Sequence, residues 1–327
     1  MKKYLLLLAL LPALNSSAQI QIGSNEIATM NRAGTIGKDD MAALKKTTTL
    51  FTLQFKDYQQ LQQFEAAIKE AWTLTPYKII RPDELGDYLK KEGYSVFSFG
   101  GFLVSRGGSA PVAQHMHLAY DLWMPEARKN GNINKKFFAR VLIYPDNESF
   151  FTAMNNINKR KDDFSSKMIS FIYNDALIFN WSPGMLQGYL KKVNQHLERH
   201  DERGPYSEET DKQALSKLKN DTLYVPDYVN VRFNMFTGAE NGDEEAGDDE
   251  LKKAYPYPVK LVSRARLDEL ILDKSKPVKY LVYVKSSTDK YINVYDSGSG
   301  NLLYARYVKM SYNFKNKDLG KLAKVID

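Results

Sequence analysis

Four histidines form two spaced pairs, and they are the side chains best suited to hold a metal ion. His115 and His117 alternate along an expected strand, on the face that also carries Asp121 and opposite its apolar face. His196 and His200 are one helical turn apart in an expected helix. If the strand pair met the helix pair, the imidazoles could form a zinc site. Nothing in the sequence brings the pairs together, so it favours four partly solvated surface histidines and predicts no cofactor.

Other catalytic patterns are fragmentary. An S-x-x-K spacing occurs at Ser216 to Lys219 and at Ser287 to Lys290, without the S-D-N and K-T-G segments that complete a serine acyl-transfer site. The sequence contains no G-x-S-x-G, H-E-x-x-H, G-x-x-x-x-G-K or G-x-G-x-x-G. These observations predict a protein without a catalytic centre.

Acidic and aromatic clusters offer binding chemistry instead. The insertion 238–250 is acidic and rich in glycine, but its spacing misses the calcium-loop pattern, which favours a solvated, mobile loop that could also dock a basic partner. Trp181, Tyr255 and Tyr257 lie beside prolines at element boundaries. Such rings can form a glycan or peptide platform, although hydrophobic staples at helix ends are the favoured interpretation.

The first 18 residues are typical of a secretory signal peptide, which export would remove near Ala18. Lys2 and Lys3 form the positive region, Leu5 to Leu14 the apolar region, and Ser16 to Ala18 the small-residue cleavage site. No later stretch approaches the roughly 20 apolar residues of a membrane span. The sequence therefore predicts an exported protein, periplasmic, associated with the outer membrane or secreted, that does not span the membrane.

Composition narrows the class of protein further. Cysteine is absent, which excludes disulfides, thiolate metal sites and a lipidated cysteine. The formal net charge is +7, and removal of Lys2 and Lys3 leaves +5. The lysines are scattered in pairs and form no aromatic-studded basic run, so a nucleic-acid partner is not expected.

Hydrophobic periodicity predicts a first module over residues 46–145, after an irregular lead-in at 19–45. Strand-like runs at 47–53, 77–80 and 94–104 alternate with helical spacing from Leu61 to Trp72 and with a helix that begins at Pro82. Met116 to Met124 alternates strictly, so one face of that strand should be buried, and 138–144 would close the sheet.

A second copy of this order is expected over residues 214–327, with the acidic loop 238–250 inside it. The tripeptide Asp-Glu-Leu at 83–85 recurs at 268–270, and an apolar strand begins at the same distance after each leucine. The predicted fold is α+β, with two β-α-β-α-β-β modules, each a mixed sheet carrying its helices on one face.

A mostly helical connector, residues 146–213, is expected to join the modules. Ser182 and Pro183 form a strong helix start, because a capping hydroxyl precedes proline at the first helical position. Leu186, Leu190, Val193 and Leu197 then lie on one apolar stripe that must be buried.

The module order, with PYKIIRPDEL and YPVKLVSRARLDEL entering the second helix, resembles the amino-terminal domain of TolB. It is also similar to the fold of the curli-secretion lipoprotein and of the periplasmic activator lipoproteins of penicillin-binding proteins. Asp296 to Gly300 fits the Asp-x-x-x-Gly turn of that group. The chain lacks the lipidated cysteine of the lipoproteins and the β-propeller of TolB. The resemblance implies an envelope role in assembly or docking and assigns no catalytic residue.

We therefore expect an exported, non-catalytic envelope protein that binds another protein. Two alternatives stay open at this point: a metal-assisted hydrolase that uses the histidine pairs, and a soluble binder of glycans or other small ligands.

Overall fold

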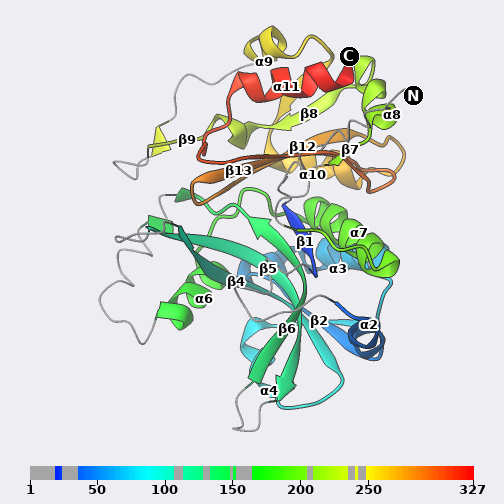
Figure 1. Ribbon diagram of the computed structural model, residues 1–327, viewed down its shortest axis with the longest axis vertical. Coiled ribbons are helices and arrows are strands. Elements are labelled where there is room, and N and C mark those ends of the chain that lie inside the picture. Colours follow the sequence, from blue (N-terminus) through cyan, green and yellow to red (C-terminus); the bar gives the residue numbers. More distant parts are fainter. Residues whose placement is uncertain are drawn as a thin grey trace, which may run out of the picture.

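Two β-sheets lie one above the other in the computed structural model, with helix α7 between them (Figure 1). The structure describes residues 19–23, 36–106, 113–127, 133–147, 150–151, 164–204, 209–234, 240–241 and 248–327. The expected signal peptide, residues 1–18, and most of the acidic loop 238–250 lie outside this part of the chain.

The first module is built from short helices and long strands. Its elements are β1 (Ile20–Ile22), α2 (Lys38–Lys45), β2 (Thr48–Thr52), η1 (Phe55–Gln60), α3 (Leu61–Ala71), β3 (Tyr77–Ile80), η2 (Pro82–Glu84), α4 (Leu85–Tyr88), β4 (Tyr94–Arg106), β5 (Ala113–Ala127) and β6 (Ile133–Ile143). Two connecting helices follow, α6 (Phe164–Asn174) and α7 (Pro183–Arg199).

The second module follows the connecting helices. Its elements are β7 (Glu209–Thr210), α8 (Lys212–Leu215), η4 (Ser216–Lys219), β8 (Leu223–Pro226), η5 (Asp227–Asn230), β9 (Arg232–Phe233), β10 (Glu240–Asn241), α9 (Asp248–Ala254), β11 (Val259–Val262), α10 (Arg264–Leu272), β12 (Lys279–Ser286), β13 (Asp289–Asp296), β14 (Leu302–Val308) and α11 (Asn316–Ile326).

The two six-stranded sheets have the same strand order. The first runs β1-β6-β5-β4-β2-β3, and the second runs β7-β14-β13-β12-β8-β11. β2 in the first sheet and β8 in the second are each parallel to both of their neighbours, while the later strands form an antiparallel meander. The prediction of an α+β protein with two mixed-sheet modules is confirmed, and the similarity extends to the short edge strands β1 and β7.

Helices cover both faces of each sheet, which differs from the expected single face. Adjacent residues of β2 point to different cores: Phe51 packs in the main core with residues of α3, whereas Leu50 packs with Leu85 of α4. The chain moves from β2 outward to β3 and then back across β2 to β4. Because parallel crossovers are right-handed, a reversal of direction puts successive helices on opposite faces.

Two local expectations also differ from the structure. The lead-in is not irregular throughout, because β1 pairs with β6 and α2 buries Met41 and Leu44. β1 has only three residues and is buried on both faces, so it shows no alternation of apolar and polar residues from which a strand could be predicted. The helix that carries the second Asp-Glu-Leu begins at Arg264, capped by Ser263, so the tripeptide lies near its end rather than at its start.

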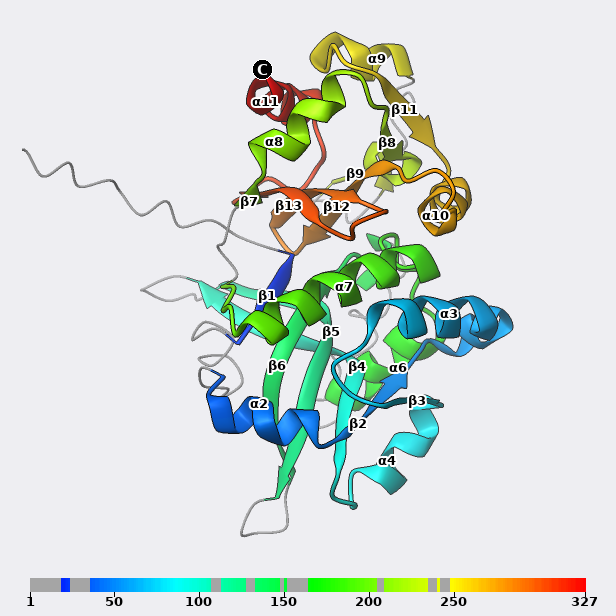
Figure 2. The same cartoon turned by 90° about the vertical axis from the view of Figure 1, so that its right-hand side faces the viewer.

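Helix α7 lies between the two sheets (Figure 2), and its buried side chains belong to one hydrophobic core that contains residues of both modules. Ser182 accepts a hydrogen bond from the Met185 amide, as the sequence predicted for a helix start at Pro183. The predicted stripe is buried, with Leu186, Leu190 and Val193 fully shielded from solvent.

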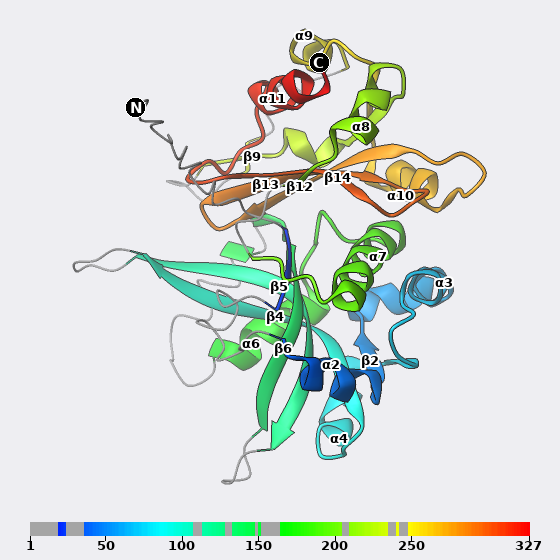
Figure 3. The same ribbon diagram turned by 45° about the vertical axis from the view of Figure 1, so that its right-hand side comes forward.

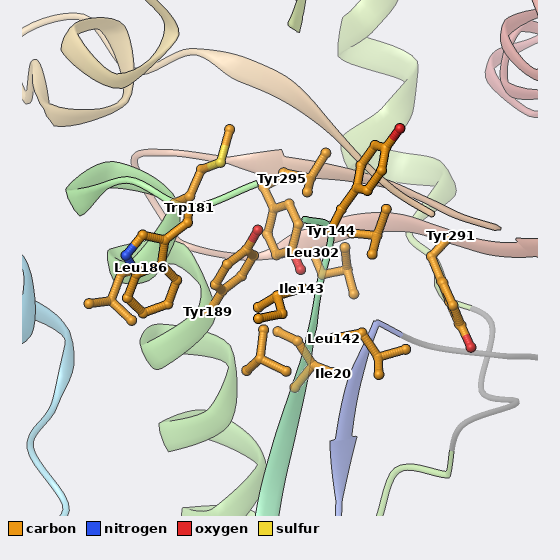
Figure 4. Close-up of a cluster of buried hydrophobic side chains, with 14 of the residues drawn as sticks. Ile20, Leu142, Ile143, Tyr144, Trp181, Leu186, Tyr189, Tyr291, Tyr295 and Leu302 are labelled. Atoms are coloured by element: carbon orange, nitrogen blue, oxygen red, sulfur yellow. The ribbon is translucent and has the colours of Figure 1, made fainter. Parts of the chain in front are cut away.

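The two sheets meet beside α7 around a cluster of aromatic and aliphatic side chains. Tyr189 of α7 lies beside Tyr295 of β13, with ring centroids 6.2 Å apart, and near Ile143 of β6 and Ile20 of β1 (Figure 4). No helix in the described residues combines the length and the apolar character that a membrane crossing requires.

Replacing Leu190 by Ala tests the role of this shared core. We expect the free energy of unfolding to fall by about 2 to 5 kcal/mol, because a fully buried side chain is removed and a cavity is left. Chemical denaturation measures the change. Leu177→Ala, at a side chain that is 37% exposed, is the control and should change the stability by less than about 0.5 kcal/mol. Equal effects would contradict the assignment of α7 as the core element.

Candidate functional site

A cleft of about 1100 Å³ opens where the two modules and the start of α7 come together. One wall consists of η1 and the start of α3, and the other consists of η5, the end of β11 and the start of α10. Residues 177–183 form the base. Figure 3 shows α3 of the first module and α10 of the second, which contribute to the two walls, beside α7. Both η1 and η5 follow the central parallel strand of their sheet, so the cleft lies at the carboxyl ends of β2 and β8. Ligands of sheets with parallel strands bind at such ends.

Asp57 and Trp181 form the floor of the cleft. Asp57 is 8% exposed, and its Oδ2 accepts hydrogen bonds from Trp181 Nε1 at 2.8 Å and from the Gln54 amide at 3.0 Å. The Trp181 ring stacks on Phe64 of α3, with centroids 6.0 Å apart. Two contacts therefore hold the Asp57 carboxylate in place. One comes from Trp181 in the connector, and the other comes from the η1 turn of the first module.

Gln54 lies beside Asp57 and is 1% exposed. Its Nε2 donates to Ile172 O at 2.5 Å and to Ala176 O at 2.9 Å, which determines which amide atom is nitrogen. Its Oε1 has no hydrogen-bond partner among the described residues. A buried acceptor without a donor is costly, so this oxygen is a candidate contact for a ligand.

Burial raises the pKa of Asp57 to about 6, because the hydrogen bonds from Trp181 and Gln54 and the charge of Lys56 only partly offset the loss of solvent. Lys56 Nζ donates to Ala176 O at 2.7 Å, and burial lowers the pKa of this lysine. The floor of the cleft thus contains a carboxyl group that titrates near neutral pH.

Two side chains of α10 fix the second module to the base of the cleft. Asp268 Oδ1 accepts a hydrogen bond from the Gly184 amide at 2.7 Å, at the first turn of α7. Arg264 Nη1 donates to Ile178 O at 3.1 Å. Burial also raises the pKa of Asp268. Both walls are therefore connected to residues 178–184, and in this part of the connector Ile178 forms an isolated bridge with Pro145.

The strand histidines lie away from this cleft, at a contact between the modules. His117 is 5% exposed and stacks on Phe102, with centroids 5.0 Å apart. Its Nδ1 is 2.7 Å from Ser286 Oγ of β12. The expectation of a solvated surface residue is wrong for His117, because the second module packs over this part of β5. His115 is opposite Val104 in the backbone register, and its side chain lies outside the described residues.

The helix histidines lie at the carboxyl end of α7. His196 is 7% exposed rather than solvated, and its Nδ1 is 2.9 Å from Asp201 Oδ2. Burial lowers the pKa of His196, and the charges of Lys192 and Arg203 lower it further. His200 ends the helix with a positive φ of 53°. No group of three or more metal-ligating side chains occurs in the described part of the chain, so no metal centre is assigned.

The three aromatic candidates do not come together. Trp181 lies in the cleft floor, whereas Tyr255 is fully buried between α9 and β11. The Tyr255 ring meets Tyr257 edge-on at 5.4 Å, and the Tyr257 hydroxyl donates to the Asp327 side chain. The acidic loop is described at 240–241 and from Asp248, where α9 begins.

Sequence reasoning missed most of the cleft. Gln54, Lys56 and Asp57 belong to no motif, and Arg264 and Asp268 were used only as part of the YPVKLVSRARLDEL segment that indicates the duplication. The available signal was positional, since polar residues follow two strands that the duplication makes equivalent. Comparison of the chain with protein-family models, curated proteins and solved structures finds no match.

Replacing Asp57 by Asn tests the state of this carboxyl group. The native pKa of about 6 exceeds the ordinary 3.8, so the folded state holds the proton more tightly and Asp57 destabilises the protein as pH rises. From about pH 4 to about pH 7, the stability of Asp57→Asn relative to the natural protein should rise by roughly 3 kcal/mol and then stay constant. Glu269→Gln, at an exposed position of the cleft, is the matched control. A relative stability that is independent of pH would contradict the assigned burial.

Proposed function

We propose that this protein is an exported module of the cell envelope, periplasmic or associated with the outer membrane, that binds a segment of another protein in the cleft between its two modules. The observation that carries the proposal is the cleft itself, whose walls come from both modules and whose base is the connector. Its volume of about 1100 Å³ is slightly larger than the usual range for small-molecule sites, which suits an extended chain segment.

The amino-terminal pattern and the module order support an envelope role. Lys2, Lys3 and the apolar run after them favour export. The resemblance to the TolB amino-terminal domain, and to the curli-secretion and penicillin-binding-protein activator lipoproteins, favours docking within an assembly. The absence of cysteine leaves protein contacts as the means of attachment to the envelope.

The alternatives receive less support from the described residues. A metal-assisted hydrolase would need the histidine pairs to converge, yet His117 contacts Ser286 and His196 contacts Asp201. A glycan binder would need rings that present a face to the ligand, and Trp181 is 6% exposed with its ring packed on Phe64. Binding of a protein segment is therefore the function that we propose first, and binding of a glycan is the second candidate.

Site-specific photocrosslinking in native envelopes tests the proposal. A photoreactive residue at Gln60 and another at Ala265, on opposite walls of the cleft, should each capture the same partner, because one segment would contact both walls. Mass spectrometry identifies the adducts. The control position is Lys321, exposed on α11 on the far face of the second sheet. Adducts that differ between the two walls, or that form equally at Lys321, would contradict binding in the cleft.

A further inference from the structure

The floor of the cleft has two acceptor oxygens, Gln54 Oε1 and Asp57 Oδ1, to which no described residue donates a hydrogen bond. Gln54 Oε1 is buried without a donor, and the amide cannot turn over because its Nε2 already donates to two carbonyl groups. Both hydrogen bonds to Asp57 end on Oδ2, which leaves Oδ1 for a ligand. A ligand that satisfies this floor must therefore bring donors.

The charges of the cleft also favour a ligand that brings hydrogen-bond donors and positive charge. Its described lining contains four acidic residues, Asp57, Asp227, Asp268 and Glu269, and two basic residues, Lys56 and Arg264. Both cations donate to backbone carbonyls of residues 176–178, and neither forms an ion pair with Asp57. The lining residues thus carry a formal charge of −2 in a chain whose formal net charge is +7, and Glu269 at the rim is paired with Arg266 at 2.7 Å.

We propose that the Gln54 and Asp57 oxygens bind the cationic head of a lysine or arginine side chain on the partner segment. This inference rests on the proposed function and adds the chemistry that would select the partner. An ammonium group has three donors and a guanidinium five, and neither has an acceptor, which matches a floor made of acceptors. A cation also supplies the counter-ion that the buried carboxylate lacks.

Apolar side chains of the cleft can contact the residues that flank the basic residue in the partner segment. Leu177, Phe179, Val231 and Leu261 line it with half-buried or exposed apolar surface. These side chains would cover the aliphatic stem of the cation and its apolar neighbours in the segment. We therefore expect a basic residue flanked by aliphatic residues in an extended chain, rather than a free amine.

Isothermal titration calorimetry with three peptides tests this assignment. The probes are acetyl-Ala-Leu-Lys-Leu-Ala-amide and the same sequence with norleucine or glutamate in place of lysine. The lysine peptide should bind the natural protein at least tenfold more tightly than the norleucine peptide, which keeps the aliphatic stem and lacks the charge. Equal binding of the two, or no binding of the lysine peptide at millimolar concentration, would overturn the proposal.

Two variants locate the contact. Asp57→Asn keeps an oxygen for Trp181 and Gln54, and it should weaken the lysine peptide at least tenfold while leaving the norleucine peptide unchanged. Glu269→Gln removes the same charge from the exposed rim and should change binding by less than about twofold, because rim charges contribute little. Equal losses in both variants would show general charge attraction and would overturn the assignment to the floor. Binding of tri-N-acetylglucosamine that Asp57→Asn abolishes would also overturn it.

The test separates this inference from the proposed function. Suppose that photoreactive residues at Gln60 and Ala265 capture one envelope partner, and that the same proteins with Asp57→Asn capture it equally well. The proposed cation site is then wrong, and the docking role stands. If the lysine peptide binds through Asp57 and neither wall captures a partner, the cation site stands and the docking role is wrong.

Discussion

The arrangement of the molecule depends on the burial of α7. Thirteen of its residues are buried, including Leu186, Leu190 and Val193, so no single sheet can cover it. Sheet 1 and α3 cover one side, and α10 and sheet 2 cover the other. Burial on this scale contributes about 1.5 to 3 kcal/mol for each large apolar side chain. The two modules are therefore held in one relative position by the helix that separates them.

That position creates the cleft and its unusual electrostatics. The amino-terminal end of α7 lies at the base of the cleft, next to the segments that follow β2 and β8. Asp268 accepts a hydrogen bond from the Gly184 amide in the first turn of α7, where a carboxylate is stabilised by the helix dipole. Asp57 lies in the first turn of η1 and accepts hydrogen bonds from the Gln54 amide and Trp181, but burial still outweighs these contacts and raises its pKa to about 6.

Local patterns predicted the elements better than the site. The Ser182 cap and the apolar stripe from Leu186 to Leu197 could be predicted because the residues that indicate a helix lie close together in the sequence. The duplication was found from two tripeptides, yet the edge strands that complete it, with three and two residues, carry no periodicity. The cleft could not be predicted because Gln54, Trp181 and Asp268 are far apart in sequence and meet only through α7. Burial of His117 likewise depends on Ser286 of the other module.

The duplicated modules are stacked in one direction rather than paired face to face. α7 packs with α3 on one face of the first sheet, and in the second module α11 packs with α9 in the corresponding way. The opposite crossover, α4 in the first module and α10 in the second, lies on the other face, and it is α10 that contacts α7. The two corresponding helices differ in burial. α11 buries one side, through Leu319, Leu322 and Ile326, and presents lysines on the other, whereas α7 is buried on both sides because the second module packs over it. The cleft therefore forms beside α7, where helices of both modules meet.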